Sequence, residues 1–175
     1  MSTDTLPQTR NDAETWTGVF QIGTTPMPLR LTGTGEALTG VHIFAPSEAV
    51  SVSDAPPASG ALRETINQLK AYFAGDLQKF DLPLRADGTP FQQKVWKANR
   101  QIPYGQTRSY WWVAVRIGDP HSVRAVGGAL GANPIPIIIP CHRVVRSDGA
   151  LGGFSSGLEW KKVLLSHEAG ASLFK

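Results

Sequence analysis

Cysteine is almost absent from this chain, because only Cys141 occurs among its 175 residues. One cysteine excludes an intrachain disulfide and a cysteine-rich zinc site. Long apolar runs are also absent: no stretch approaches the roughly 20 residues that cross a bilayer, and no basic start with an apolar run marks a secretory signal. We therefore expect a cytoplasmic protein without a membrane partner, a metal or a cofactor.

Acidic residues are scarce in the second half of the chain. Residues 1–89 carry six Lys/Arg and ten Asp/Glu, a net charge of −4, whereas residues 90–175 carry eleven Lys/Arg and four Asp/Glu, a net charge of +7. A basic half predicts an anionic partner, of which nucleic acid is the commonest. A solvated basic face would give the same charges, so the choice depends on the motifs in that half.

The first half, residues 1–88, is predicted to be a small α/β domain that ends in a linker over residues 82–88. Within residues 16–52, short apolar runs are broken by Gly and Thr-Gly turns, which is typical of a β-meander. Residues 61–74 predict a helix, since apolar residues fall on one face: Leu62, Ile66, Leu69 and Phe73. Residues 1–15 are polar and are expected to form a frayed tail.

The second half, residues 89–175, is predicted to be mostly helical. Thr89-Pro90-Phe91-Gln92 has the pattern of a capping box with Pro at the first helical position. Ser109 can cap a second helix over residues 110–117, and a third helix follows a Gly-Asp-Pro break and covers residues 122–131. Two short helices around a tight turn are typical of a helix-turn-helix.

Cys141 lies in the run Ile-Pro-Cys-His-Arg-Val-Val, in a segment over residues 134–145 that we expect to be extended. A lone cysteine is most often a small buried hydrophobe. Here a potential base, His142, and a fixed positive charge, Arg143, follow at once, and such neighbours can hold a thiol as the reactive thiolate. The neighbours of Cys141 therefore favour a nucleophile.

His142 needs a third group to orient it if it is to act as a base. Glu168 is the best acidic candidate, and it lies in a final helix over residues 157–168 whose Leu158, Val163 and Leu164 are expected to face the core. The other acids of this half lie in turns or at a helix start, where capping explains them: Asp119, Asp148 and Glu159.

The third predicted helix is poor in long side chains, with the sequence Ser-Val-Arg-Ala-Val-Gly-Gly-Ala-Leu. Two helical glycines cost about 1 kcal/mol each relative to Ala, so close approach to another surface must compensate. A thin helix with the single Arg124 suits the minor groove of DNA, and tight packing on another helix is the alternative. An enzyme acting on a base must extrude it from the stack. Tyr110 could press on the DNA backbone or hydrogen-bond the extruded base, and a half-buried structural tyrosine is the alternative.

Together these motifs resemble the active-site half of the O6-alkylguanine-DNA alkyltransferases. The similarity covers nearly all of residues 89–170. Its motifs are Phe91–Trp96, Ile102–Gly105, Ser109-Tyr110, Arg124–Gly128, Ala132–Val145, Gly153–Ser155 and His167-Glu168. The first half matches only through Thr25-Pro26 and Ala71–Gly75. The resemblance implies an α/β (α+β) fold in which a small sheet-and-helix domain precedes a winged-helix-like domain.

The resemblance also implies direct-reversal DNA repair in a single turnover. A monomer would bind the minor groove of double-stranded DNA, flip out an O6-alkylguanine and transfer its alkyl group irreversibly to Cys141. His142, Glu168 and Asn133 would complete the catalytic network. The residues implied to bind DNA are Tyr110, Arg124, Ala125, Gly127, Gly128 and Ala129. Those implied to form the substrate pocket are Tyr110, Val144, Phe154, Ser155 and Ser156, without a metal or a cofactor.

Some residues depart from the family pattern. Trp111-Trp112 stand where members usually carry small or polar residues, Phe154 where tyrosine is common and Ser156 where glycine is common. The two tryptophans can pack in the helix-turn-helix core, extend the DNA-facing surface or contact a partner. Phe154 and Ser156 border the implied pocket, so the preference among alkyl groups is expected to differ from that of typical members.

Three other functions compete with alkyl transfer. The chain could be a module that binds lesions without chemistry, a hydrolase that uses Cys141, His142 and Glu168, or a helix-turn-helix transcription regulator. A binding module or a regulator leaves the cysteine motif unexplained, and no oxyanion-hole loop accompanies the cysteine as a hydrolase requires. Saturable, stoichiometric alkyl uptake would separate alkyl transfer from all three.

Overall fold

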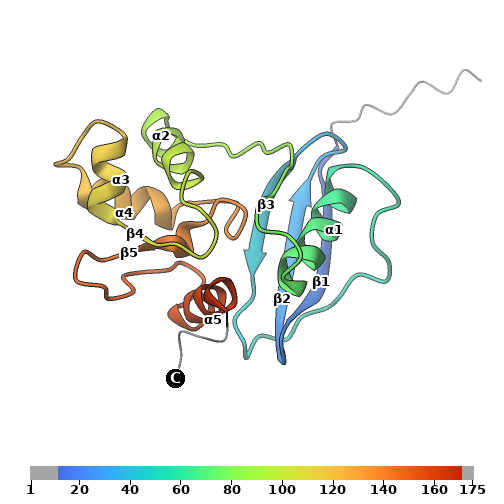
Figure 1. The fold of residues 1–175 in the computed structure, drawn as a ribbon. Helices are drawn as coiled ribbons and strands as arrows, with labels where there is room; N and C mark the ends of the chain where they lie inside the picture. The colour runs from blue at the N-terminus through green and yellow to red at the C-terminus, as the bar shows by residue number, and fades with distance from the viewer. Residues whose placement is uncertain (1–11, 171–175) are drawn as a thin grey trace, which may run out of the picture.

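The computed structural model describes residues 12–170, which form an antiparallel sheet, five α-helices and a short two-stranded pairing (Figure 1). The sheet contains β1 (Glu14–Ile22), β2 (Thr25–Gly33) and β3 (Leu38–Ile43) in that order. The predicted meander is therefore confirmed. Residues 14 and 15, which were expected to belong to a frayed tail, are part of β1, and residues 1–11 of that prediction lie outside the described residues.

Helix α1 (Ala61–Ala74) covers one face of the sheet and confirms the predicted helix. Its four predicted core residues are all buried. The helix ends at Gly75, whose φ of 87° is left-handed and therefore costs glycine little. The first part of the predicted linker is hydrogen-bonded to the edge of the sheet, since Leu38 N donates to Pro83 O at 2.9 Å and Arg85 N donates to Leu38 O at 2.8 Å.

The C-terminal elements begin with α2 (Pro90–Asn99), which starts with the predicted capping box between Thr89 and Gln92. Helix α3 (Tyr110–Arg116) is capped by Ser109, whose Oγ accepts from Trp112 N at 3.0 Å, and α4 (Val123–Gly131) follows. The remaining elements are β4 (Arg108–Ser109), the 3-10 turn η1 (Cys141–Arg143), β5 (Val144–Val145) and α5 (Leu158–Ala169), with β4 and β5 paired in parallel. The predicted helix-turn-helix is present.

Two expectations for this half are wrong. The segment over residues 134–145 is not extended throughout, because the chain turns at Ile137 (φ 75°) and coils into η1 at Cys141. Leu158 does not face the core and is an exposed side chain, since it stands at the first position of α5. The buried face of α5 consists instead of Trp160, Lys161, Leu164 and Glu168.

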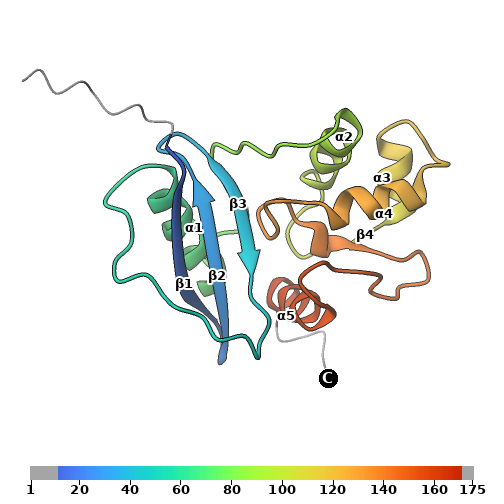
Figure 2. The ribbon, with the colours of Figure 1, turned by 180° about the vertical axis from the view of Figure 1, so that it is seen from behind.

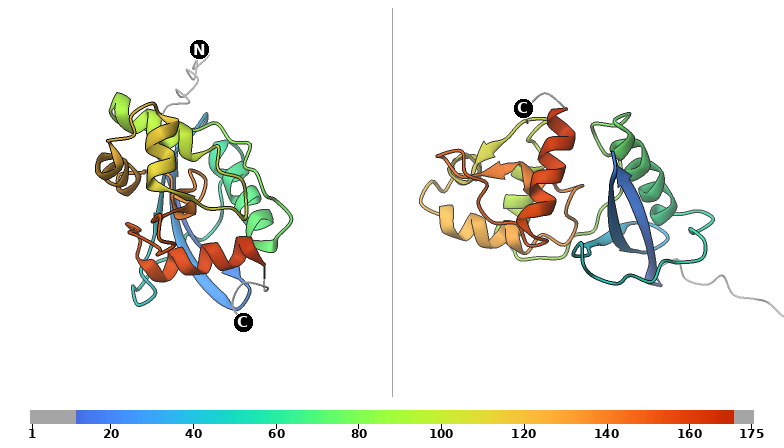
Figure 3. Two further views of the ribbon diagram at one scale, coloured as in Figure 1. Left: turned by 60° about the vertical axis from the view of Figure 1, so that its left-hand side comes forward. Right: turned by 90° about the horizontal axis from the view of Figure 1, so that it is seen from below.

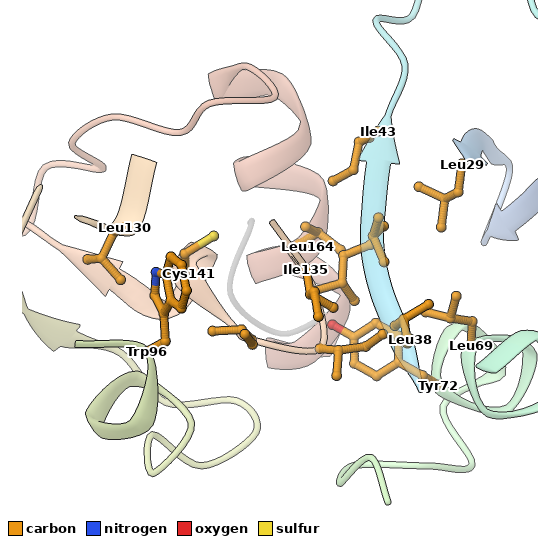
Figure 4. Packing of buried hydrophobic residues seen from close by; sticks show 14 of the residues in the cluster. Leu29, Leu38, Ile43, Leu69, Tyr72, Trp96, Leu130, Ile135, Cys141 and Leu164 are labelled. Carbon is orange, nitrogen blue, oxygen red and sulfur yellow. The ribbon is translucent and has the colours of Figure 1, made fainter. Parts of the chain in front are cut away.

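The sheet is packed on both faces. Figure 3 shows α1 on one side of the strands and α5 on the other, and Figures 1 and 2 show β3 as the strand nearest the C-terminal elements. Trp160 Nε1 donates to Phe44 O at 2.9 Å, and Val41 N donates to Pro134 O at 2.9 Å. One buried cluster therefore runs through both halves, from Leu29 and Leu69 to Leu130 (Figure 4).

Candidate active site

Cys141 is the first residue of η1, and it follows the apolar segment 134–140. Only 6% of the cysteine is exposed, and its backbone N–H donates to Ile139 O at 2.8 Å. The positive φ of Ile137 is unusual for a β-branched residue, and the fully buried side chain of this residue holds the strained turn in place. The segment therefore fixes the backbone that presents the thiol.

The thiol borders a pocket of about 420 Å³ between α4 and the loop that precedes α5. The residues that line the pocket are Tyr110, Gly127, Leu130, Gly131, Cys141, Gly153, Phe154 and Ser155. Gly152, with a φ of 71°, lets the loop pass close to Tyr110, since a Cβ there would stand 2.5 Å from the tyrosine hydroxyl. The pocket is within the size range of small-ligand sites and has the reactive sulfur on its wall.

Asn133 holds the sulfur from one side. Its Nδ2 donates to Cys141 Sγ at 3.2 Å and to Ile139 O at 2.8 Å, while its Oδ1 accepts from Ile135 N at 3.0 Å. Burial raises the pKa of the Cys141 thiol, and the Asn133 hydrogen bond and the positive charge of Lys161 offset only part of that rise. Asn133 therefore both positions the sulfur and favours its ionised form.

Lys161 is the cation that acts on the thiol, whereas the sequence suggested Arg143. The Lys161 side chain is buried, and Nζ donates to the carbonyls of Val144 at 2.7 Å, Gly153 at 3.0 Å and Leu151. Burial lowers the pKa of Lys161 to about 8, so the ammonium is still the main form at neutral pH. One lysine thus ties β5 to the pocket loop and places a positive charge near the sulfur.

His142 is fully buried and its Nε2 lies 2.8 Å from Glu168 Oε1. Burial lowers the pKa of the imidazole, so His142 is neutral near pH 7. An ionised carboxylate only accepts hydrogen bonds, so Nε2 must carry the proton and Nδ1 must present a lone pair. Nδ1 has no hydrogen-bond partner among the described residues, and it is therefore available as a base.

Glu168 accepts from a full set of donors, which are Tyr72 Oη at 2.6 Å, His142 Nε2, Arg143 Nε and Nη2 at 2.8 Å each, and Gly105 N at 3.3 Å. Burial alone would raise the pKa of this carboxyl. The hydrogen bonds from His142 and Arg143, together with the positive charge of Arg143, outweigh burial and hold the pKa well below the ordinary range. Glu168 is therefore an ionised anchor that orients the imidazole.

Tyr72 reaches this network from the other half of the chain. It belongs to α1, and its ring crosses the core so that its hydroxyl points toward the C-terminal elements (Figure 4). Its carbonyl also accepts from His167 Nε2, at 2.7 Å. The first half therefore supplies one of the donors that hold Glu168.

Helix α4 carries an exposed face of small residues beside the pocket. Arg124, Ala125 and Gly128 are exposed, and a Cβ at Gly128 would meet no atom within 4 Å. A Cβ at Gly127 would meet only the Tyr110 ring, at 3.9 Å. Tight internal packing at the glycines is thus the wrong explanation. Ala129 faces inward, where its carbonyl accepts from the Trp96 indole at 2.8 Å.

The structure brings most of the residues implied by the resemblance to one place. The pocket is lined by Tyr110, Gly127, Cys141, Phe154 and Ser155. Asn133 is hydrogen-bonded to Cys141, and the next residue, His142, is hydrogen-bonded to Glu168. Val144 and Ser156 do not line the pocket. Val144 is buried and its carbonyl accepts from Lys161, and Ser156 is half-buried in the adjoining loop.

Three further residues of the site were not predicted as members of it: Tyr72, Arg143 as the partner of Glu168, and Lys161. Arg143 also donates through Nη1 to Ile102 O, at 2.8 Å. A sequence signal existed for Lys161 alone, because it precedes Leu164 by three and Glu168 by seven residues and so shares their helix face.

None of the helices in the described range is long and apolar enough to cross a membrane.

Comparisons with known proteins agree on one family. Residues 90–170 match the family model described as the DNA-binding domain of 6-O-methylguanine DNA methyltransferase. The chain is 48% identical over 141 residues to the methylated-DNA–protein-cysteine methyltransferase of Mycobacterium tuberculosis strain H37Rv, covering 81% of this chain and 86% of that one. It is 58% identical over 106 residues to the protein of the same name from Methanosarcina barkeri, covering 61% and 67%.

Solved structures give the same result. The crystal structure of the M. tuberculosis protein in complex with DNA superposes with a TM-score of 0.75 at 46% identity, covering 89% of this chain and 92% of that one. The crystal structure of M. tuberculosis O6-methylguanine methyltransferase superposes with a TM-score of 0.75 at 41% identity, covering 94% and 100%. The similarity includes the β-sheet half as well as the pocket half.

Proposed function

This chain belongs to the methylated-DNA–protein-cysteine methyltransferase family, and we propose that it repairs alkylated DNA with Cys141 as the alkyl acceptor. The reaction is the transfer of an alkyl group from DNA to a protein cysteine. The observation that carries the proposal is the placement of Cys141 Sγ on the wall of a pocket beside the exposed face of α4. Family membership favours this chemistry over a hydrolase, a regulator or a binding module.

The proposed chemistry is one in-line displacement. His142 Nδ1, directly or through a water, accepts the thiol proton, and Asn133 and Lys161 stabilise the resulting thiolate. The sulfur attacks the alkyl carbon, the new S–C bond forms, and the bond from that carbon to guanine O6 breaks. The proton held by His142 then passes to the leaving guanine. The thioether is a poor leaving group, so each molecule reacts once.

The remaining site residues are proposed to hold DNA and the extruded base. Arg124, at the exposed start of α4, takes the place that the base leaves in the stack, with α4 in the minor groove. Tyr110 contacts the base, and the N–H of Ser155 donates to guanine O6. The Val144 carbonyl can accept a hydrogen bond from the amine of the base only if its oxygen also keeps the hydrogen bond from Lys161 Nζ. We propose that the protein acts as a cytoplasmic monomer that associates with the nucleoid when bound to DNA.

Intact mass is the direct test of this function. The protein is mixed with an excess of duplex DNA that contains a single O6-methylguanine, and in parallel with the unmodified duplex. We expect the mass to rise by one methyl group only with the lesion, and uptake to stop at one methyl per protein. Specific binding of the lesion without any mass change would reduce the protein to a recognition module.

The pH dependence of alkyl uptake tests the role of Lys161. The Lys161 ammonium favours the thiolate, so replacing it with a neutral side chain raises the pKa of Cys141 further. In Lys161→Met we expect the rise of the single-turnover rate with pH to move to higher pH, and the rate at pH 7 to fall. Lys162→Met, on the exposed neighbour, is the matched control and keeps the wild-type profile. Equal profiles for all three proteins would show that Lys161 is only structural.

A further inference from the structure

The two tandem tryptophans of α3 have different surroundings. Trp112 is half-buried against the core, and the Arg108 guanidinium lies 5.8 Å from the centre of its ring. Trp111 is 55% exposed, although its side chain is as large and apolar as that of Trp112. Core packing therefore explains Trp112 and leaves Trp111 unexplained. A large aromatic ring held in water on a helix is typical of a contact surface.

Trp111 forms one wall of a shallow groove of about 360 Å³, whose other lining residues are Tyr110, Val123, Arg146, Ser147 and Asp148. Tyr110 lines both this groove and the pocket of Cys141. The groove and the pocket therefore adjoin at Tyr110. A nucleotide chain whose extruded base occupies the pocket must continue past Tyr110, and the groove lies next to it.

The groove also contains one cationic side chain, Arg146, that can bind a phosphate. Arg146 is paired with Asp148 (Nη2 to Oδ2, 3.0 Å), and the two side chains are 62% and 57% exposed. A solvent-exposed pair of this kind is weak, so the guanidinium can turn to a phosphate at little cost. An aromatic ring beside an arginine is the combination that holds the apolar and anionic parts of a nucleotide.

We propose that this groove binds the sugar-phosphate backbone next to the extruded nucleotide, with the Trp111 indole against the deoxyribose and Arg146 on the phosphate. The inference rests on the proposed function, since it takes the extruded base to be in the Cys141 pocket. Such contacts position the DNA without reading its sequence. Trp111 is then a positioning residue for duplex substrates only, because the free base does not extend into the groove.

Trp111→Ala tests the indole contact. Its affinity for a lesion duplex is expected to fall about tenfold, a size typical of truncated tryptophan anchors. The ratio of methyl uptake from the duplex to uptake from free O6-methylguanine falls with it. Trp111→Phe keeps a ring and restores most of the affinity. Val19→Ala, an exposed apolar residue on β1, is the matched control and is expected to behave as wild type.

Arg146→Gln tests the phosphate contact. We expect the slope of log affinity against log salt concentration to fall by about one. A duplex with a neutral methylphosphonate at the linkage next to the lesion should bind wild type and Arg146→Gln equally. The proposal is overturned if Trp111→Ala and Arg146→Gln both bind the duplex as tightly as wild type does. It is also overturned if the affinity difference between wild type and Arg146→Gln persists with a methylphosphonate on either side of the lesion. Absence of methyl uptake by wild type from both substrates refutes the proposed function instead, while the affinities still decide the groove.

Discussion

Cys141→Ser is expected to take up no alkyl group from a lesion duplex, with its affinity for that duplex unchanged. The serine hydroxyl is nearly isosteric and can still accept the Asn133 hydrogen bond, so the pocket keeps its shape. A hydroxyl, however, does not ionise near neutral pH as a thiol does, and oxygen is a weaker nucleophile toward an sp³ carbon. Neither Asn133 nor Lys161 can compensate for that chemical difference.

The measurement is intact mass after incubation with one equivalent of lesion duplex, followed by peptide mapping. Wild type should gain one methyl group, on the peptide that contains residue 141. Cys141→Ser bound to the duplex at the same affinity provides the control for recognition. Uptake retained by the variant, or a methyl group found on another residue of wild type, would remove Cys141 from the role of acceptor.

Glu168→Gln is expected to be the most destabilising single change in the site that keeps side-chain size. The carboxylate accepts from Tyr72, His142 and Arg143, and all of these partners are buried. An amide puts two donors among them and leaves the guanidinium without its counter-charge. Breaking a buried pair from one side costs about 3–5 kcal/mol, which corresponds to a fall in Tm of roughly 10 °C for a chain of this size. Single-turnover alkyl uptake should fall as well, because the imidazole loses its orientation.

The same variant should change how stability depends on pH. The folded-state pKa of Glu168 is held well below the ordinary value of about 4 that it has in the unfolded chain. Its ionised form therefore stabilises the fold above about pH 4, and this stabilisation is lost progressively as the pH falls from there toward the lower folded-state pKa. Unfolding free energies measured from pH 7 to pH 3 should therefore drop less steeply in Glu168→Gln than in wild type. Glu159→Gln, an exposed change in the same helix, is the control. Identical slopes would mean that the network does not stabilise the ionised carboxylate.

Local sequence signals predicted the parts of the fold that local physics determines. Glycine turns separate the strands of the meander, Gly75 ends α1, and Thr89 with Gln92 begins α2. Each of these features depends on a few neighbouring residues whose backbone preferences do not need the rest of the chain. The adjacent pair Cys141-His142 was likewise found as a unit, because both members lie within one short run.

Features that depend on contacts between distant residues were not predicted. The Tyr72 hydroxyl meets Glu168 across 96 positions of sequence, and nothing in the helix that contains Tyr72 marks it as a partner. For Lys161 the sequence shows only that it shares a helix face with Leu164 and Glu168, whereas its three carbonyl partners come from segments that the fold brings together. The turn at Ile137 opposes the preference of a β-branched residue, so the sequence indicated extended chain there.

The Tyr72 hydrogen bond shows that the residues matched by the family model are fewer than the residues that build the site. Residues 90–170 suffice for a family match, and they contain the proposed nucleophile Cys141, the proposed base His142 and its partner Glu168. Yet Glu168 receives one of its donors from α1, and the ring of that same tyrosine packs edge-on against Tyr104 and His167 of the second half. A chimaera that joins this C-terminal half to a different partner domain inherits a carboxylate with a missing neighbour. A different first half is therefore expected to replace the native one only if it supplies a tyrosine at the position of Tyr72.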